Sequence, residues 1–215
     1  MLTLFGNLES GNVHKVQMIL CRVGKAYRRV DVAQTRGEPR DEKFLAINPM
    51  AKVPAVLLEG GRLITESGAI LYYFSQHTSL WPEAVDARTE VLRWMFFEQY
   101  SHEPSLAVMR YLRLFVDDPS VHAGRVAELE PKAQHALTVM ESRLSDQEWL
   151  ATDGCTIADY ALYPYTRTAD TIGIRMEQFP GIEKWLARVE FQAGFIPLGS
   201  DGAVEALSFA EYFQT

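Results

Sequence analysis

AKVPAVLLEGGRLITESGAI, residues 51–70, contains two short apolar runs joined by Gly60 and Gly61, and this pattern predicts a β-hairpin. Pro54 stands at the entry of the first run. It is either an ordinary strand-entry proline, which has no N–H to donate, or a cis proline in a tight turn. A cis bond would turn the backbone N–H and C=O of Val53 outward, where they could pair with an extended peptide. The residues alone leave both interpretations open.

Glu66 and Ser67 open the helix that is expected after this hairpin. The simplest interpretation is a helix cap, with Thr65 or Ser67 as the capping residue and an acid favoured by the helix dipole. The alternative is a ligand site. The unpaired N–H groups of a helix N-terminus and a serine hydroxyl suit a carboxylate, and a glutamate beside them would hold an ammonium group. Together these groups would form a receptor for the zwitterionic end of an amino acid.

Around the hairpin, the first 77 residues alternate between strand and helix patterns. The expected elements are, in chain order, a strand at 2–6, a helix at 13–23, a strand at 27–32, a surface loop at 35–41, a short helix at 42–49, the hairpin strands at 55–59 and 62–65, and a helix at 67–77. The order is βαβ followed by ββα, so we expect an α/β domain over residues 1–77.

The pattern changes after His77. A proline-containing linker at 78–87 leads into stretches with helical periodicity, and the first of them is one long pattern that carries Pro104. We therefore expect an all-α helical domain over residues 88–215.

The composition narrows the class of protein. The 215 residues are 47% hydrophobic and 23% charged, so a substantial core is expected and disorder is not. The net charge of −7 argues against nucleic acid or an anionic membrane as the main partner. The N-terminus has no signal-peptide pattern, no apolar run reaches the roughly 18 residues of a membrane span, and Cys21 and Cys155 form no CxxC pair. We expect a cytoplasmic protein without disulfides.

These features resemble those of the cytosolic glutathione transferases, which have a thioredoxin-like first domain and an all-α helical second domain. The segments NPMAKVP and ESGAI match the family patterns N-P-x-x-x-V-P and E-S-x-A-I. In TIADYAL, Thr156 and Asp159 stand at capping-box spacing, and this segment resembles the buried folding signal of the family's helical half. Each motif is short, but their order on this topology is specific. The resemblance covers about residues 1–198, and the tail after Pro197 lies outside it.

The resemblance implies a glutathione-binding site in the first domain. Pro54 would be cis, and the backbone of Val53 would pair with the cysteinyl part of glutathione. Glu66 and Ser67 would bind the γ-glutamyl end. Lys52 would attract a carboxylate of the tripeptide, the glycyl one, or would simply be a solvated loop lysine.

The chemistry of such a family requires a thiolate, whereas a free thiol with a pKa of about 8.5 is ionised to only a few per cent at neutral pH. Family members place Tyr, Ser or Cys near the end of the first strand to lower this pKa. Here Phe5 stands at the tyrosine position, and residues 6–12 contain no cysteine. Ser10, and after it Asn12, is therefore expected to donate a hydrogen bond to the sulfur, as in bacterial members with a serine/asparagine-type loop. Both residues could instead cap the following helix.

The resemblance places the second-substrate side on the helical domain. Tyr100, His102 and Arg110 are polar residues in a long apolar helix that would lie beside the cleft. A core face of aromatic residues with a solvated polar face would give the same pattern. His102 has no further ligands nearby in the sequence, so no metal site is expected.

The leading hypothesis is a homodimeric glutathione transferase, which activates the thiol of glutathione for attack on a small electrophilic molecule, as in detoxification. A second hypothesis keeps glutathione as the co-substrate and changes the reaction to disulfide or peroxide reduction, or to isomerisation. A third hypothesis is a non-catalytic binding module with the same fold. The sequence does not identify the electrophile.

Overall fold

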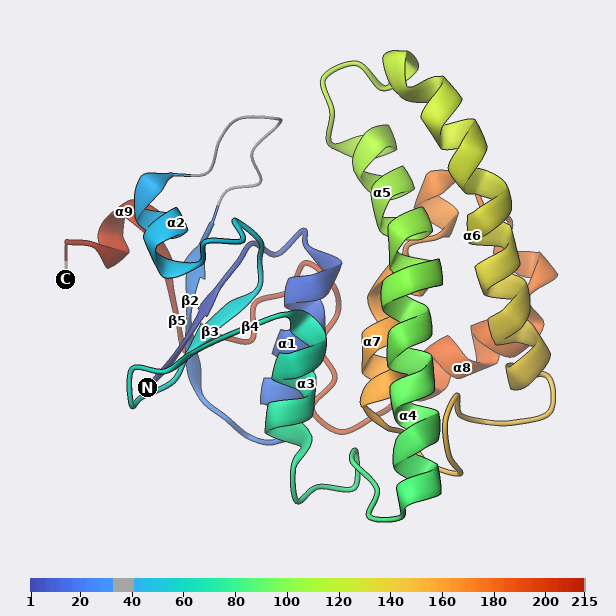
Figure 1. Cartoon of the computed structure of the whole chain (residues 1–215), viewed down its shortest axis with the longest axis horizontal. Helices are drawn as coiled ribbons and strands as arrows, with labels where there is room; N and C mark the ends of the chain where they lie inside the picture. Colours follow the sequence, from blue (N-terminus) through green and yellow to red (C-terminus); the bar gives the residue numbers. More distant parts are fainter. Residues whose placement is uncertain (33–40, 215) are drawn as a thin grey trace. The chain divides into compact units, whose positions relative to one another are not determined.

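The computed structural model describes residues 1–32 and 41–214, so the surface loop expected at 35–41 lies, except for Asp41, outside the described residues. The chain divides into two compact units (Figure 1). The first unit combines the described residues of Met1–Gln76 with those of Ala193–Thr215, and the second is His77–Gln192.

The first unit is a mixed β-sheet with helices on both faces. Its elements are β1 (Leu2–Phe5), α1 (Gly11–Arg22), β2 (Tyr27–Asp31), α2 (Glu42–Ile47), β3 (Ala55–Leu57), β4 (Leu63–Thr65), α3 (Ser67–Ser75), β5 (Glu205–Ser208) and α9 (Phe209–Tyr212). The sheet has five strands in the order β4-β3-β1-β2-β5. β1 is parallel to β2 and antiparallel to β3, β4 is antiparallel to β3, and β5 is parallel to β2. The expected order of βαβ followed by ββα, and with it the thioredoxin-like fold, is confirmed.

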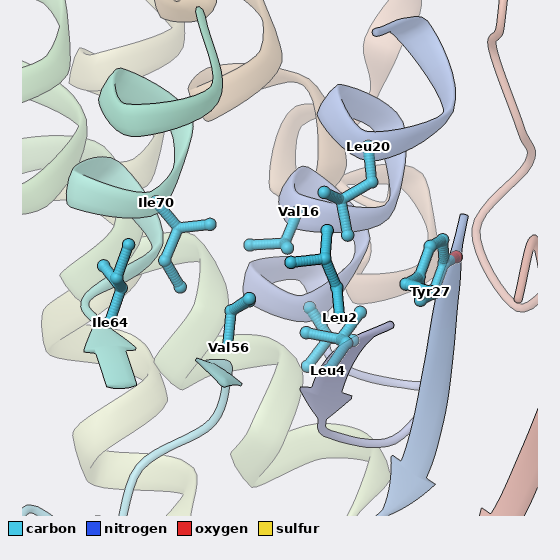
Figure 2. Close-up of a cluster of buried hydrophobic side chains, with 9 residues drawn as sticks. Leu2, Leu4, Val16, Leu20, Tyr27, Val56, Ile64 and Ile70 are labelled. Atoms are coloured by element: carbon cyan, nitrogen blue, oxygen red, sulfur yellow. The ribbon is translucent and has the colours of Figure 1, made fainter. Parts of the chain in front are cut away.

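The alternation of side chains along β1 divides the core between the two faces of this sheet. Leu4 and Phe5 point to opposite faces, as successive residues of a strand do. The cluster on the α1 and α3 face, drawn in Figure 2, consists of Leu2, Leu4, Val13, Val16, Leu20, Tyr27, Val56, Ile64 and Ile70. The cluster on the other face consists of Phe5, Val30, Val32, Phe44 and Ala55, with Phe209 and Tyr212 packed against it. The sheet therefore lies between α1 and α3 on one side and α2 and α9 on the other.

The C-terminal segment, residues 193–214, belongs to the first unit. Our assignment of residues 88–215 to the helical domain is therefore wrong for this part of the chain. β5 pairs in parallel with β2, with Arg28 opposite Glu205 and Val30 opposite Leu207. The pairing satisfies backbone groups that β2 would otherwise expose at the edge of the sheet, which is the physical reason why the tail folds back onto this unit.

The second unit is helical, as expected. Its longer elements are α4 (Val85–Phe97), a π-helical turn (Glu98–His102), α5 (Glu103–Leu114), α6 (Ala123–Leu144), α7 (Ile157–Arg167) and α8 (Pro180–Glu190). The long pattern that carries Pro104 is interrupted by the π-helical turn directly before this proline. Pro104 itself stands in the first turn of α5, where its missing N–H is best tolerated.

α7 begins with the capping box that TIADYAL predicted. Thr156 Oγ1 accepts a hydrogen bond from Ala158 N, and Thr156 N donates to Asp159 Oδ2 at 2.8 Å. Asp159 Oδ1 accepts from Leu150 N at 3.2 Å and from Trp185 Nε1 at 2.9 Å. Asp159 is fully buried, so one carboxylate joins the start of α7 to α8 and to the segment before α7.

Candidate functional site

The sheet brings the predicted site residues of the first unit to one edge. Ala55, the first residue of β3, lies opposite Phe5 of β1 and opposite Thr65 of β4, and both pairs are antiparallel. The residues that precede Ala55 therefore lie beside those that follow Phe5 and Thr65. The loop after β1, the entry of β3 and the start of α3 converge at this edge.

At the entry of β3, the Val53-Pro54 peptide bond is cis, as the resemblance implied. Neither the N–H nor the C=O of Val53 has a hydrogen-bond partner among the described residues. The turn before it is held by Asn48, whose buried side chain donates from Nδ2 to Lys52 O at 2.7 Å and accepts from Met50 N at 3.2 Å. The Lys52 side chain is exposed. The turn thus presents the two backbone groups of Val53, which have no partner among the described residues, next to a cation.

At the start of α3, Glu66 has φ 66° and ψ 117°. A positive φ is uncommon for a residue with a side chain, and such outliers concentrate at functional sites. Glu66 is exposed, and its carboxylate has no hydrogen bond or ion pair within the described part of the chain. Ser67 is buried, and its Oγ donates to Asn12 Oδ1 at 3.4 Å. The start of α3 therefore offers an unpaired anion beside a hydroxyl and helix N–H groups.

Ser10 caps α1, because its Oγ accepts a hydrogen bond from Val13 N at 3.3 Å. The capping interpretation is thus confirmed. The hydroxyl can still donate a second hydrogen bond, because the oxygen that accepts from Val13 N keeps its own hydrogen. No described residue accepts that hydrogen. The first turn of α1 contains no acidic residue, so nothing in it neutralises the positive end of the helix dipole.

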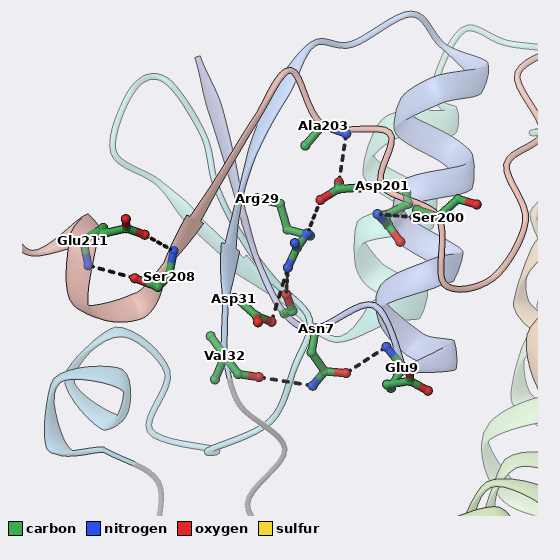
Figure 3. A network of polar contacts seen from close by, with 12 residues as sticks. Asn7, Glu9, Arg29, Asp31, Val32, Ser200, Asp201, Ala203, Ser208 and Glu211 are labelled. Atoms are coloured by element: carbon green, nitrogen blue, oxygen red, sulfur yellow. Dashed lines mark hydrogen bonds and ion pairs between the residues drawn. The ribbon is translucent and has the colours of Figure 1, made fainter.

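Two residues that hold the loop before α1 were missed by sequence reasoning. Asn7 donates from Nδ2 to Val32 O at 3.1 Å and accepts from Glu9 N at 3.1 Å (Figure 3). Arg29 donates from Nη1 to Gly6 O at 3.3 Å. Both side chains are buried. Asparagine in a short polar loop is a turn signal that could have identified Asn7, whereas nothing in the strand pattern marks Arg29 as buried.

The residues predicted for the second-substrate side lie in the second unit in different environments. Tyr100 is 87% exposed. The guanidinium of Arg110 lies over the ring of Phe115, 4.8 Å from its centroid. His102 is fully buried, and its Nε2 lies 2.8 Å from Thr166 Oγ1. His102 is thus a polar contact within the helical core, and this burial contradicts its expected place facing a substrate.

Two titratable groups of α1 are perturbed by burial. The ring of His14 is buried with its Nε2 2.8 Å from Ile196 O, and burial lowers the pKa of His14 to about 4, so the ring is neutral at pH 7. Burial raises the pKa of the Cys21 thiol, and a hydrogen bond with Tyr27 only partly offsets this effect. Cys21 is therefore a thiol at neutral pH, and it forms no disulfide with Cys155.

Among residues 1–32 and 41–214, no three His, Cys, Asp or Glu side chains are grouped so as to hold a metal ion. Within the same ranges, no helix has both the length and the apolar character needed to cross a membrane.

The chain is similar to known proteins over both of its units. Residues 1–76 match the family model of the glutathione S-transferase N-terminal domain, and residues 105–192 match that of the C-terminal domain. A glutathione S-transferase from Xanthobacter autotrophicus is 37% identical, with a TM-score of 0.87, over 92% of this chain and 97% of that one. A glutathione S-transferase from Pseudomonas fluorescens is also 37% identical, with a TM-score of 0.88, over 92% and 98% of the two chains.

A more distant relative is the transcriptional regulator URE2 of Saccharomyces cerevisiae, which is 28% identical over 85% of this chain. The match spans 63% of the length of that yeast protein. A structure of Ure2p in complex with glutathione has a TM-score of 0.80 and 28% identity, over 90% of this chain and 95% of that one. The two family models and the two bacterial structures together establish that this chain belongs to the glutathione S-transferase family.

Proposed function

We propose that this protein is a glutathione transferase that activates the thiol of glutathione for attack on a small electrophilic molecule. The observation that carries the proposal is the register of β1, β3 and β4. Through Ala55, it gathers the unpaired backbone of Val53, the start of α3 and the start of α1 at one edge of the sheet. These groups match the extended backbone, the zwitterionic end and the thiol of one tripeptide.

In this proposal, the first unit holds glutathione through Val53 and Glu66, whose groups have no partner among the described residues, and through Ser67, whose hydroxyl turns from Asn12 to the ligand. Val53 pairs with the cysteinyl backbone as an added strand would. Glu66 holds the γ-glutamyl ammonium, and Ser67 with the N–H groups of α3 holds the adjoining carboxylate. Lys52 attracts the glycyl carboxylate. The relative Ure2p, whose structure contains glutathione, supports the choice of this ligand.

Ser10 donates a hydrogen bond to the sulfur in this proposal. The hydrogen bond that Ser10 Oγ accepts from Val13 N fixes this oxygen at the N-terminus of α1. The hydroxyl hydrogen can then be donated to the thiolate. Asn12 is the second candidate, since its amide also carries donors. A hydroxyl is too weakly acidic to remove the thiol proton, so that proton passes to solvent, while the donor and the helix dipole stabilise the anion that remains.

The reaction that follows is conjugation. The thiolate sulfur forms a bond to the electrophilic carbon, and the leaving group departs with the electron pair of the bond that breaks. A chloronitrobenzene substrate tests this proposal directly. We expect enzyme-dependent release of chloride with glutathione, and the absence of any rate above the uncatalysed reaction for several electrophile classes would refute conjugation.

Reduction or isomerisation with glutathione is the second candidate. A mixed-disulfide mechanism would be served by a cysteine at the start of α1, but residues 6–12 contain none. Conjugation is therefore favoured over disulfide reduction. A glutathione-containing mixed disulfide, assayed beside the chloronitrobenzene, distinguishes the two reactions.

A non-catalytic role is the third candidate, and the observation in its favour is the relative named as a transcriptional regulator. Such a module would retain glutathione binding without lowering the pKa of the bound thiol. Binding and thiol ionisation therefore have to be measured separately.

We also propose that the protein is a homodimer in the cytoplasm. Each unit exposes large apolar side chains, including Tyr72 and Tyr73 on α3, and Leu92 and Phe96 on α4. The free cysteines suit a reducing compartment. The second unit, with Tyr100 and Arg110, would provide the electrophile side. A monomer in light scattering at micromolar concentration would refute the dimer.

A further inference from the structure

The C-terminal segment, residues 193–214, makes contacts with the helix that carries the proposed thiolate donors. Ile196 O accepts a hydrogen bond from His14 Nε2 at 2.8 Å, and Ser200 O accepts one from Gln17 Nε2 at 3.5 Å. His14 and Gln17 are both fully buried on α1. The segment thus provides hydrogen-bond acceptors for buried polar side chains of α1.

Arg29 on β2 joins this segment to the loop that precedes α1 (Figure 3). Its Nε donates to Asp201 Oδ2 at 2.8 Å, while its Nη1 donates to Gly6 O at 3.3 Å and lies 3.2 Å from Asp31 Oδ1. The side chain of Arg29 is 9% exposed. A planar guanidinium with five donors can serve all three acceptors at once, and its orientation is set by the charged ones.

Asp201 is itself fixed where the segment turns into β5. Its Oδ1 accepts a hydrogen bond from Ala203 N at 3.1 Å, and the next residue, Val204, donates from its N–H to Tyr27 O at 3.0 Å. One carboxylate therefore shapes the turn through one oxygen and holds Arg29 through the other.

The loop residues that follow Gly6 are linked to Ser10 by further hydrogen bonds. Asn7 holds Val32 O and Glu9 N through its side chain, and Ser10 N donates to Asn7 O at 3.4 Å. Gly6 is thus tied to β2, Asn7 is tied to Val32 directly after β2, and Ser10 is tied to Asn7. A displacement at Gly6 is passed to Ser10 through these bonds.

We infer, on the basis of the function proposed above, that the C-terminal segment is a positioning element for the thiol-activating loop, with Asp201 and Arg29 as its positioning residues. Asp201 orients the guanidinium of Arg29, and the guanidinium fixes the carbonyl of Gly6. The loop then presents Ser10 to the sulfur of glutathione. Asp201 and Arg29 act through the loop and contact no substrate atom.

Asp201→Asn in the full chain tests this inference, because the amide keeps the shape of the side chain and removes one of the two carboxylate charges that orient Arg29, while Asp31 keeps the other. We expect kcat for conjugation to fall about tenfold, since small misplacements of reacting groups cost this much or more. The KM for glutathione should change less than about twofold, because Val53, Glu66 and Ser67 still hold the tripeptide. The pH profile should shift to higher pH, because the thiolate is less stabilised.

Glu205→Gln is the matched control. It makes the same change from carboxylate to amide on the same segment, but Glu205 pairs with Arg28, and Arg28 hydrogen-bonds no loop residue within the described ranges. We expect an unchanged kcat and pH profile for this variant. Asp201→Glu restores the charge and should recover most of the lost rate. Equal effects of Asp201→Asn and Glu205→Gln would overturn the inference.

Amide hydrogen exchange gives a readout that does not depend on activity. The amides of Glu9 and Ser10 should exchange faster in Asp201→Asn than in Glu205→Gln. If Asp201→Asn does not fold, the unmodified chain in mild urea takes its place: these loop amides should lose protection in the same step as β5. Loop amides that stay protected after β5 opens would overturn the inference. A wild-type protein that neither binds nor uses glutathione would instead refute the proposed function. The hydrogen-exchange measurement would still test whether the C-terminal segment holds the loop.

Discussion

Ser67 Oγ lies 3.4 Å from Asn12 Oδ1, so the first residue of α3 and the second residue of α1 are in contact. Each helix has a partial positive charge at this end. Two helix N-termini that meet in this way form a place for negative charge. Glutathione would bring two negative groups to it, the γ-glutamyl carboxylate to α3 and the thiolate to α1.

Ser67→Ala should weaken glutathione binding, because it removes the hydroxyl that turns from Asn12 Oδ1 to donate to the γ-glutamyl carboxylate. A hydrogen bond to a charged group contributes about 1.5–3 kcal/mol, which corresponds to roughly a tenfold to hundredfold rise in Kd. Isothermal titration calorimetry measures this change.

Ser75→Ala is the control for the same substitution at the other end of α3. Ser75 is also buried, but its Oγ donates to Tyr72 O within the helix. This variant should lose stability without losing affinity. If both variants bind glutathione as tightly as the wild type, Ser67 does not contact the ligand.

Ser10→Gly separates the two roles of this residue. Glycine replaces an N-cap serine at a cost of only a few tenths of a kcal/mol, so α1 should remain intact while the thiolate donor is lost. We expect conjugation to slow by about tenfold to a thousandfold, as is usual when one donor to an anion is removed. Stopped-flow rates and urea unfolding curves measured side by side separate the loss of activity from the loss of stability.

Asn12→Ala tests the competing donor. If Asn12 donates instead of Ser10, the loss of rate belongs to this variant, and Ser10→Gly is nearly silent. Partial losses in both single variants and a larger loss in the double variant would show that both donate. Wild-type rate and thiol pKa in the double variant would leave only backbone N–H groups as candidates.

Gly6→Ala should destabilise the first unit by about 1–3 kcal/mol, in the range of other overpacked sites. A Cβ at Gly6 would lie 2.3 Å from Val13 Cγ2, and Val13 is a stiff, fully buried side chain. Gly60→Ala is the control, because a Cβ there meets no atom within 4 Å. Adding Val13→Ala to Gly6→Ala should relieve the contact, so a double variant that is no better than the sum of the single ones would contradict this explanation.

His14 predicts a pH dependence of stability. Its pKa is about 4 in the folded protein and ordinarily 6.5, so between these values the unfolded chain binds more protons than the native one. Stability should therefore fall as the pH drops from about 6.5 to about 4, by roughly 3 kcal/mol in total, and this contribution should level off below.

His14→Gln keeps a neutral donor for Ile196 O and cannot be protonated. Urea unfolding of both proteins at a series of pH values isolates the histidine from the carboxylates that also titrate. The wild type should lose more stability than His14→Gln across this window. Parallel curves would show that His14 is not buried as the structure describes.

Short-range patterns predicted much of the first unit and of the site. The run from Ala51 to Ile70 identified the hairpin, Pro54 and the start of α3, because each of these depends on residues close together in the chain. Ser10 was also identifiable, since serine before an apolar helical pattern is a cap whatever its further role. These features depend on residues that are close together in the chain, so sequence patterns can predict them.

The features that were missed depend on distant residues. Arg29 and Asp201 are 172 residues apart, and the sequence around each residue gives no indication of its partner. β5 is a short edge strand, Glu205–Ser208, whose side chains are only partly buried, so its stability comes from pairing with β2. His102 was expected on the second-substrate side or on a solvated helix face, because the sequence does not reveal its contact with Thr166.

The thiol pKa of bound glutathione is the most direct test of the central claim. Glutathione bound to the wild-type protein is titrated from acid to alkaline pH while thiolate absorbance is followed, with free glutathione as the reference. The account predicts saturable binding, a pKa of the bound thiol at least about one unit below that of the free thiol, and a return toward the free value in the variant that lacks both donors at Ser10 and Asn12. Binding with an unchanged thiol pKa would contradict the account and leave a glutathione-binding module without transferase chemistry.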